Sequence, residues 1–454
     1  MQLQWRQIDR RQARAARRVV LLLALSYAVS FVDRALVAVA GAPIRHEFGL
    51  SDTQFGSLHG LAFAAMYCLC GVPFGWLADR VARRGLLAAG LVFWSAMTAL
   101  CGLATSYPMF FAARIGVGFG EACLVPVAMS MLGNTVARGE MAQAVAIFLM
   151  GATLGNSAAL IGGGQLLSAL GNDAVRAAWH LGSAPPWRVL FGVAALPGFV
   201  VALLAMMLRE PPRDGVDSSA AGARGLRAAA LHLRAHGRAY GFLTAATACS
   251  VTLSQAQAAW MPLFFVRRFG LAPGDAATTV GLLFLATAPA GQWAGGRALA
   301  LMLQRRGVDA PANLLLALTG LLSLPAAACF CFADDRRTCE LGYAAFNFIV
   351  FSATPAGMTG WQWLTPDRVR GLLVAVLVAA VTLVGVGLGP SAVGLLTDRW
   401  FADPRALNLA LLMLVCAAGL ACAAFALAGR RAFARATHAG DAMDPPPTPA
   451  AEVA

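Results

Sequence analysis

Twelve long apolar runs are the feature that most constrains how this chain can fold. A helix that crosses a membrane needs about 20 consecutive, mostly apolar residues. Of the 454 residues, 59% are hydrophobic and only 13% are charged, which is the composition of a membrane protein rather than a water-soluble one. We place the runs at residues 19–41, 54–77, 85–104, 107–133, 141–169, 187–208, 238–264, 276–303, 311–332, 338–363, 371–397 and 405–429.

The longest interval between these runs divides the chain into two halves of six runs each. It opens with the Pro-containing stretch REPPR and ends in an arginine-rich segment, as expected of a linker at a membrane surface. We therefore expect an all-α membrane protein with twelve transmembrane helices in two six-helix bundles. The expected parts are a basic N-terminal tail (1–18), a first bundle (19–208), a linker (209–237), a second bundle (238–429) and a disordered Pro- and Ala-rich tail (430–454).

The positive charge follows the loops. The formal net charge is +13, which taken alone is compatible with nucleic-acid binding. The arginines, however, concentrate in alternate loops between the apolar runs. Because positively charged loops stay on the cytoplasmic side of a membrane, this pattern predicts that the N-terminal tail, the linker and the C-terminal tail are cytoplasmic, and it indicates no nucleic-acid partner.

Four ionisable residues interrupt the apolar runs of the first half. Asp33 and Arg34 stand in FVDRALVAV, and Arg114 and Glu121 in RIGVGFGEA. Adjacent residues point about 100° apart around a helix, so Asp33 and Arg34 cannot simply face each other; Arg114 and Glu121 lie seven residues apart and share a face. We expect them to provide the missing partners. Two interpretations stay open: a neutral buried network that fixes two helices, or ionisable groups lining a transport path.

The loop after the second run reads GWLADRVARRG and contains Gly75, Asp79, Arg80, Arg83 and Arg84. It resembles the signature loop of the major facilitator superfamily, G-x-x-x-D-R-x-x-R-R. We expect Gly75 to permit close helix approach and Asp79 to latch one bundle to the other; alternatively, the arginines only enforce topology. The corresponding segment of the second half, GGRALALMLQRRG, lacks the acid, so its latch should be weak or absent.

If the fold is that of the superfamily, the first, fourth, seventh and tenth runs surround a central cavity. Polar and aromatic side chains in these runs are candidates for lining it, although a Ser or Thr in a helix often bonds only to its own backbone. The candidates are Tyr27, Ser30, Gln255, Gln257, Trp260, Asn347 and Gln362.

No pattern indicates a cofactor. The ten cysteines are scattered and the six histidines are unclustered, so neither has the spacing of metal ligands, and we expect no metal and no cofactor. Most of the cysteines should be packing residues. Cys329, Cys331 and Cys339 flank one loop and could pair in an oxidising compartment.

Several segments together resemble the Spinster family, lipid and sphingolipid transporters with many bacterial relatives. They are FVDRALVAVAGAPIRHEFGLSDTQFGSL, RIGVGFGEA, PWRVLFGVAALPGF with REPPR, WMPLFFVRRFGL and GLGPSAVGLLTDRWF. The resemblance implies that Asp33 and Glu121 take part in proton coupling, and that Arg34 and Arg114 contact substrate or form charge pairs. Helix one departs from the family by reading FVDR where the family often has Asn-Tyr-Leu-Asp-Arg.

The resemblance implies a proton-coupled secondary transporter of the bacterial inner membrane. We expect a monomer that moves an amphiphilic or anionic substrate, such as a lysophospholipid or sphingolipid, by rocker-switch alternating access. Anion symporters of the same superfamily also have the acid–Arg pair, so a proton-linked symporter of sugar acids or aromatic acids is the alternative. A non-transporting receptor or scaffold is a remote one. We expect no enzyme, since no cluster of nucleophile, base or metal ligands is present.

Overall fold

The structure is a computed structural model, and it describes residues 10–78, 80–136, 140–178, 183–208, 210, 227, 229–305, 309–366 and 370–443. Within these ranges the chain is helical and contains no strand. The first half comprises α1 (Arg10–Val39), α2 (Gly41–Phe48), α3 (Asp52–His59), α4 (Leu61–Ala78), α5 (Arg83–Leu103), α6 (Tyr107–Glu121), α7 (Leu124–Thr135), α8 (Met141–Ala158), η2 (Ala159–Gly163), α9 (Gly164–Leu170), α10 (Asp173–Ala178) and α11 (Pro186–Met207).

The second half comprises α13 (Gly237–Phe269), α14 (Pro273–Gln304), α15 (Pro311–Phe332), α16 (Arg336–Ser352), α17 (Thr354–Leu364), α18 (Arg370–Val381), η3 (Thr382–Leu388), α19 (Gly389–Leu395), η4 (Leu396–Phe401), η5 (Pro404–Ala406) and α20 (Leu407–Met443). Each of the twelve expected runs is mostly helical. Eight of the described helical segments are long and apolar enough to span a membrane by length and composition. The runs at 54–77, 238–264, 276–303 and 338–363 are helical but are not among these eight.

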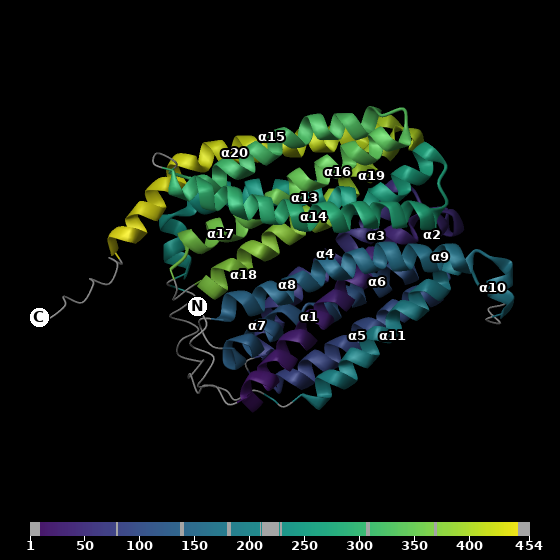
Figure 1. Cartoon of the computed structure of the whole chain (residues 1–454), viewed down its shortest axis with the longest axis horizontal. Helices are drawn as coiled ribbons and strands as arrows, with labels where there is room; N and C mark the ends of the chain where they lie inside the picture. The colour runs from purple at the N-terminus through teal and green to yellow at the C-terminus, as the bar shows by residue number, and fades with distance from the viewer. Residues whose placement is uncertain are drawn as a thin grey trace, which may run out of the picture.

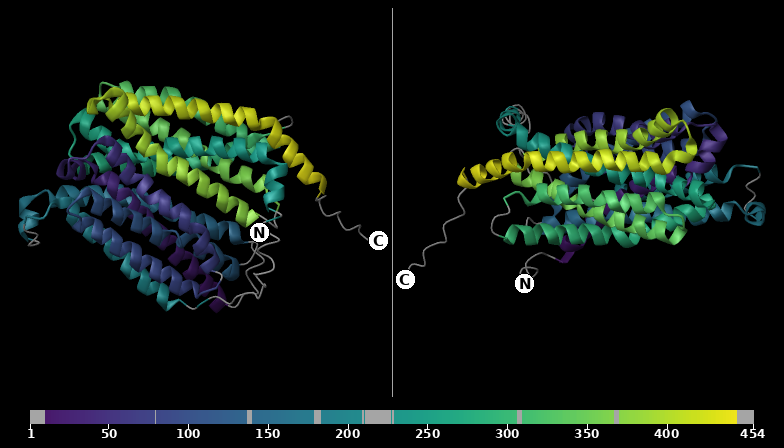
Figure 2. Two further views of the ribbon diagram at one scale, coloured as in Figure 1. Left: turned by 180° about the vertical axis from the view of Figure 1, so that it is seen from behind. Right: turned by 90° about the horizontal axis from the view of Figure 1, so that it is seen from above.

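The helices form two bundles that lie side by side, one from each half of the chain (Figures 1 and 2). Within the first bundle α5 packs on α11 and α1 on α8, and within the second α20 packs on α13 and α15. The bundles meet where α3 contacts α19, where α4 contacts η3, and where α14 contacts η2 and α9. Helix α1 begins and α20 ends at one end of the molecule; we call the opposite end, with α2 and η5, the distal end (Figure 1).

Close helix contacts depend on small residues. A β-carbon at Gly118 of α6 would collide with the carbonyl oxygen of Phe63 in α4, and one at Gly155 of α8 with that of Ala28 in α1. Small residues let helix backbones approach closely in membranes, where apolar burial against lipid gives no driving force. The eleventh run contains the π-helical segment η3, and a second one, η4, begins at its end; such segments often occur at functional sites.

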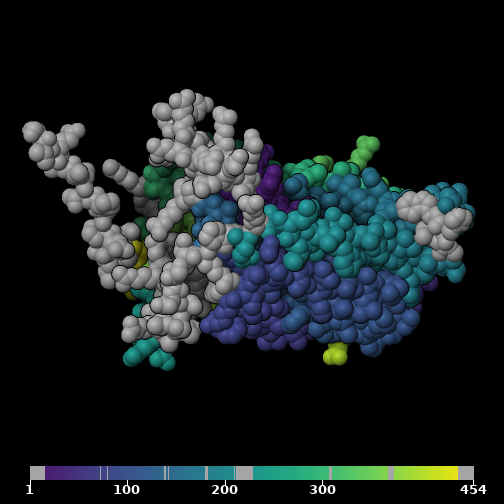
Figure 3. Space-filling view, turned by 90° about the horizontal axis from the view of Figure 1, so that it is seen from below, coloured from purple at the N-terminus to yellow at the C-terminus, as the bar shows by residue number. Residues whose placement is uncertain are grey.

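The outer surface is apolar, as a bilayer requires. Figure 3 shows the first bundle from the side on which α5 and α11 pack together. Large apolar side chains on these two helices stay exposed, among them Phe93, Leu103, Leu203 and Met207. In a water-soluble protein such a face would mark an interaction surface; on a helix of spanning length it is the surface that contacts lipid.

The ends of the bundles differ from the expected boundaries. The expectation of disorder from residue 430 is wrong up to residue 443, because α20 continues to Met443. Ala and Arg are strong helix formers, and the buried Phe433 packs its ring against Trp363. Residues 444–454 lie outside the described chain. In the linker, residues 229–235 are helical, and α1 begins at Arg10 rather than near residue 19.

The cysteines form no disulfide. All ten are free thiols, including Cys329, Cys331 and Cys339. Cys331 and Cys339 are buried, as expected for packing residues.

Candidate functional site

Arg34 and Glu121 form a buried ion pair between α1 and α6. Arg34 Nη2 lies 2.7 Å from Glu121 Oε2, and Arg34 Nε donates to the same oxygen at 2.8 Å. Ser30, one turn earlier on α1, donates its hydroxyl to Glu121 Oε2 at 2.5 Å. The Glu121 side chain is fully buried. The structure thus brings together two of the four predicted charges, and Ser30 with them.

Three aromatic rings surround the Arg34 guanidinium. Its carbon lies 4.2 Å from the ring centre of Phe63, 4.7 Å from that of Phe31 and 5.2 Å from that of Tyr67. Cation–π contacts of this kind stabilise a desolvated cation by up to about 2 kcal/mol. Phe63 and Tyr67 belong to α4 and were not among the predicted site residues, because nothing in an apolar run distinguishes a ring that faces a cation.

The expected pair between Asp33 and Arg114 is not formed. Arg114 Nη1 donates to the backbone oxygen of Asp33 at 3.2 Å, not to its carboxylate. Both carboxylate oxygens of Asp33 and Arg114 Nε are buried without a hydrogen-bond partner among the described residues. The physical reason is the position of Asp33 on α1: its side chain lies near Thr98 of α5, whose hydroxyl is also unpartnered in that part of the chain. Asp33 is fully buried.

His59 is a further ionisable residue of the site that was not predicted. It is the last residue of α3, lies within electrostatic reach of Arg114, and its Nδ1 is buried without a hydrogen-bond partner among the described residues. A signal was present in the sequence, because an ionisable side chain inside a membrane span is a functional candidate by default. The predicted Tyr27 stacks on Phe148, with ring centres 4.4 Å apart.

Gln257 and Asn347 form a polar network inside the second bundle. Gln257 Nε2 donates to Asn347 Oδ1 at 3.3 Å, Tyr343 donates to Gln257 Oε1 at 2.5 Å, and Asn347 Nδ2 donates to Thr287 at 2.6 Å. Both predicted residues are buried. They were expected to line a cavity; in this conformation they instead satisfy each other's hydrogen bonds, as buried polar groups must.

The remaining candidates of the second half form no hydrogen bond with this network in the described part of the chain. Trp260 is fully buried, donates its indole N–H to the backbone oxygen of Pro390 at 2.9 Å and packs edge-on against Phe55. It belongs to the contact between the bundles and does not line an accessible space. Gln255 is half-buried and Gln362 is exposed.

The signature loop is described except for Asp79, so the proposed latch of that residue lies outside the described chain. Gly75 does not permit an unusually close helix approach: a β-carbon there would make an ordinary contact, 3.9 Å from Pro126. Arg80 lies over the Trp76 ring at 3.9 Å and donates to the Trp76 backbone oxygen. The expectation that Gly75 permits a close helix approach is therefore wrong in this conformation.

Arg83 and Arg84 are anchored by Glu210, the acid of the REPPR segment. Glu210 accepts from the backbone N–H groups of Arg83 and Arg84 at 2.9 and 3.1 Å, and from Arg83 Nε at 3.1 Å. Burial raises the Glu210 pKa, but these bonds outweigh it and hold the pKa below its usual value. Arg83 is buried and also donates to Asn134 at 2.7 Å. These arginines thus fix the end of the first bundle, beyond enforcing topology.

A charged cluster joins the two bundles at the distal end. The buried carboxylate of Asp52 pairs with Arg45 at 2.5 Å and with Arg267 of the second bundle at 2.6 and 2.8 Å. Asp398 accepts from the backbone N–H groups of Asp52 and Thr53 at 3.1 and 2.6 Å, at the start of α3. We call Arg45, Asp52, Arg267 and Asp398 the distal latch.

Glycines let the backbones meet beside the distal latch. A β-carbon at Gly394 would collide with the Asp52 carbonyl oxygen, and one at Gly56 with that of Pro390. The two bundles are therefore in direct backbone contact at this end. No group of His, Cys, Asp and Glu side chains that could hold a metal ion occurs in the described part of the chain.

Comparison with known proteins identifies the family. The sequence profile of the Major Facilitator Superfamily matches residues 23–360. The chain belongs to this superfamily. It is 30% identical to an MFS-type efflux pump of Mycolicibacterium smegmatis over 418 residues, which is 90% of this chain and 91% of the pump. The expected all-α fold is confirmed, and the protein is a membrane transporter and not an enzyme.

The resemblance to the Spinster family is also confirmed. A solved bacterial homologue of the human lysosomal transporter Spinster, in an inward-facing and occupied conformation, is 26% identical, with a TM-score of 0.75 over 92% of this chain and 96% of that one. A second similarity is shorter: a probable L-galactonate transporter of Escherichia coli is 32% identical over 136 residues, or 30% of each chain.

Proposed function

We propose that the protein is a proton-coupled transporter of the bacterial inner membrane that moves an amphiphilic anion, similar to a lysophospholipid or sphingolipid, by alternating access. The observation that carries this proposal is the difference in hydrogen bonding between two buried acids, Glu121 and Asp33. Glu121 accepts hydrogen bonds from Ser30 and from Arg34 Nε on one oxygen and forms an ion pair with Arg34 Nη2, whereas Asp33 accepts none from the described residues.

The different surroundings of Glu121 and Asp33 indicate which of the two carboxyl groups is ionised. An ionised carboxylate buried without donors costs several kcal/mol, an effective penalty that a neutral acid avoids. We therefore assign a proton to Asp33 and a negative charge to Glu121 in this conformation. A structural network would satisfy all four ionisable residues. The unpartnered oxygens of Asp33 favour the proton-coupling interpretation over the neutral network.

Protonation of Glu121 would link the proton to the substrate. It removes the negative partner of Arg34 and leaves a guanidinium whose fork of donors matches a phosphate or carboxylate. The rings of Phe31, Phe63 and Tyr67 around Arg34 provide an apolar wall for the part of an amphiphile next to its head group. Arg114, whose Nε is unpartnered, is the second candidate for an anion contact.

The conformation supports a sequence of states. With the distal latch closed, substrate reaches Arg34 from the end at which α1 begins. We propose that this end is cytoplasmic, following the arginine distribution, and that both termini lie there. Opening of the distal latch would then expose the site to the opposite side, while the signature loop with Asp79 closes the cytoplasmic side. We propose that one chain is sufficient for this cycle.

A proton-linked symporter of sugar acids is the second candidate. The similarity to the probable L-galactonate transporter favours it, because a carboxylate also matches Arg34. It differs from the first candidate in the rest of the ligand, since a sugar acid has hydroxyl groups where a lipid has an apolar chain.

A thermal-shift panel with the purified protein distinguishes these candidates. We expect an anionic lysophospholipid to raise the melting temperature, and D-galactonate or L-galactonate to leave it unchanged. The Arg34→Gln variant should lose the stabilisation, whereas Arg337→Gln, which alters an exposed arginine at the start of α16, should keep it. Stabilisation by the sugar acid alone would establish the second candidate. Equal stabilisation of the Arg34→Gln variant would exclude Arg34 from the site.

A further inference from the structure

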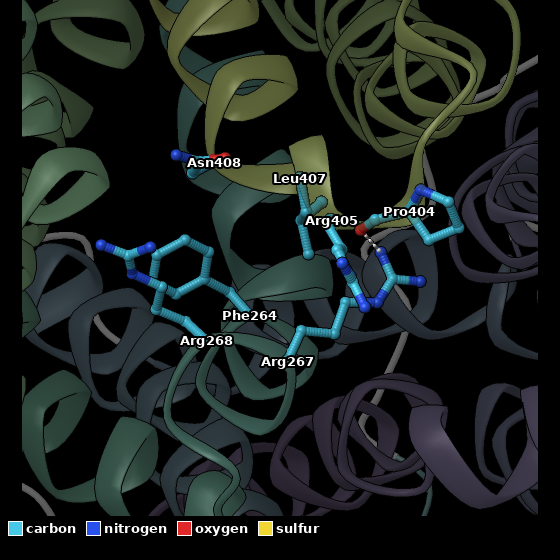
Figure 4. A pocket seen from close by; sticks show the side chains of 7 residues that line it. All are labelled: Phe264, Arg267, Arg268, Pro404, Arg405, Leu407 and Asn408. Atoms are coloured by element: carbon cyan, nitrogen blue, oxygen red, sulfur yellow. Dashed lines mark hydrogen bonds between the residues drawn. The ribbon is translucent and has the colours of Figure 1, made fainter.

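A cavity of about 330 Å³ lies at the distal end of the second bundle. It is formed by the last residues of α13 together with η5 and the start of α20 (Figure 4). The lining residues are Phe264, Arg267, Arg268, Pro404, Arg405, Leu407 and Asn408. Three arginines therefore line one small cavity. Because like charges repel, this arrangement is unfavourable unless an anion compensates the charge.

The three arginines are held to different degrees. Arg267 is held by Asp52 and donates to the backbone oxygen of Pro404 at 3.0 Å. Arg268 donates to the backbone oxygen of Ala333 at 3.1 Å, and its acidic partner, the fully exposed Asp334, lies 3.4 Å away. The exposed side chain of Arg405 makes no hydrogen bond or ion pair with any described residue.

The acid beside Arg405 does not neutralise it through a contact. Asp403 uses its carboxylate to accept the backbone N–H of Arg405 at 2.8 Å, as the cap of η5. The cavity thus has one uncompensated guanidinium and one weakly compensated guanidinium. Asn408 is a third polar group; its amide donates to the Cys331 backbone oxygen at 3.3 Å. Phe264 and Leu407 make the remaining wall apolar.

We propose that this cavity binds an oxyanion of the phosphate type, with Arg405 as its main ligand (Figure 4). Guanidinium groups bind phosphate through pairs of charge-assisted hydrogen bonds. The phosphate is either the head group of a lipid or free in solution. The apolar wall of Phe264 and Leu407 accommodates the glycerol and first methylene groups of a lipid. This site is separate from Arg34 and Glu121, and it does not depend on proton coupling.

Arg267 connects the anion site to the distal latch. Its guanidinium contacts Asp52 on one side and the Pro404 carbonyl of the cavity on the other. An anion in the cavity competes with Asp52 for Arg267 and so weakens the contact between the bundles. Because coupling between two sites is reciprocal, removal of the Asp52 charge should strengthen anion binding.

The test is calorimetric titration of inorganic phosphate into the full-length protein in neutral detergent. We expect saturable binding to the wild type, and an affinity about tenfold lower for Arg405→Gln, equivalent to about 1.4 kcal/mol. Arg337→Gln carries the same charge change outside the cavity lining and should bind as the wild type does. Asp52→Asn should bind more tightly. Because Arg405 is exposed, its replacement should leave the melting temperature unchanged, so a loss of binding does not reflect unfolding.

The two sources of the phosphate are distinguished by competition. If phosphatidic acid displaces inorganic phosphate from the wild type and phosphatidylcholine does not, the natural ligand is a lipid head group. Phosphate binding that neither lipid affects identifies the free anion. Absence of saturable binding of both phosphate and phosphatidic acid, or equal phosphate affinity in wild type and Arg405→Gln, would overturn the proposal.

Discussion

Replacing Glu121 with Gln is expected to lower the stability of the protein by about 2 kcal/mol, whereas replacing Asp33 with Asn should leave it unchanged or raise it. The two substitutions are chemically alike, and both residues are buried. They differ in their partners. Glu121 neutralises Arg34 at 2.7 Å, so its amide variant leaves a desolvated guanidinium without a counter-charge. Asp33 has no such partner among the described residues and is assigned a proton, so its neutral amide variant breaks no ion pair.

Thermal unfolding followed by tryptophan fluorescence, in one detergent at one pH, measures this difference. We expect Glu121→Gln to lower the melting temperature by several degrees. The matched control is Glu340→Gln, which breaks an exposed i,i+4 pair with Arg336; exposed pairs of this kind contribute less than about 1 kcal/mol. A destabilised Asp33→Asn beside an unaffected Glu121→Gln would show that the assigned charges of the two acids are wrong.

Replacing Asp52 with Asn is expected to open the distal end. The Asp52 carboxylate pairs with both Arg45 and Arg267, and without it the two positive groups would lose their shared counter-charge. Burial, and after it the charge of Arg267, already lowers the pKa of the Arg45 guanidinium. A loss of about 2 kcal/mol from the closed state would change the ratio of closed to open molecules roughly thirtyfold.

Pulsed electron paramagnetic resonance detects this opening. Spin labels at His46 and Arg399, both exposed at the distal end, would be attached in a background without the native cysteines. We expect a second, longer distance in Asp52→Asn and only the short distance in the control Asp334→Asn, whose pair with Arg268 is exposed and spans 3.4 Å. A single short distance in both variants would mean that backbone contacts, and not the charges, keep this end closed.

The sequence was sufficient to predict the helices and one of the two ion pairs. Each apolar run has a local pattern that lipid imposes, so twelve runs correspond to twelve helical stretches. Arg34 and Glu121 were paired correctly because charges inside a membrane are rare and must find each other. The partner of Asp33 was not predicted correctly, because seven-residue spacing on α6 fixes the face of Arg114 but not which oxygen of Asp33 its guanidinium reaches.

Contacts between segments far apart in the sequence could not be predicted from the sequence alone. Asp398 accepts the backbone N–H of Asp52, 346 residues away, and Glu210 accepts from Arg83, 127 residues away. Neither Asp398 nor Glu210 stands in a sequence pattern that indicates its partner. In the sequence, Phe63 and Tyr67 cannot be distinguished from the other aromatic residues of the apolar runs; only the fold places their rings beside Arg34. Gln257 and Asn347 were correctly singled out as polar, but their accessibility depends on packing within the second bundle.

Proton-driven transport in vesicles tests the central proposal most directly. The wild type and the variants Asp33→Asn and Glu121→Gln would be reconstituted into liposomes with a pH gradient of either sign, and the movement of a labelled anionic lysophospholipid would be measured. We expect the gradient to drive net movement in the wild type and to have no effect on it in either variant. An unchanged dependence on the gradient in both variants would contradict proton coupling through Asp33 and Glu121.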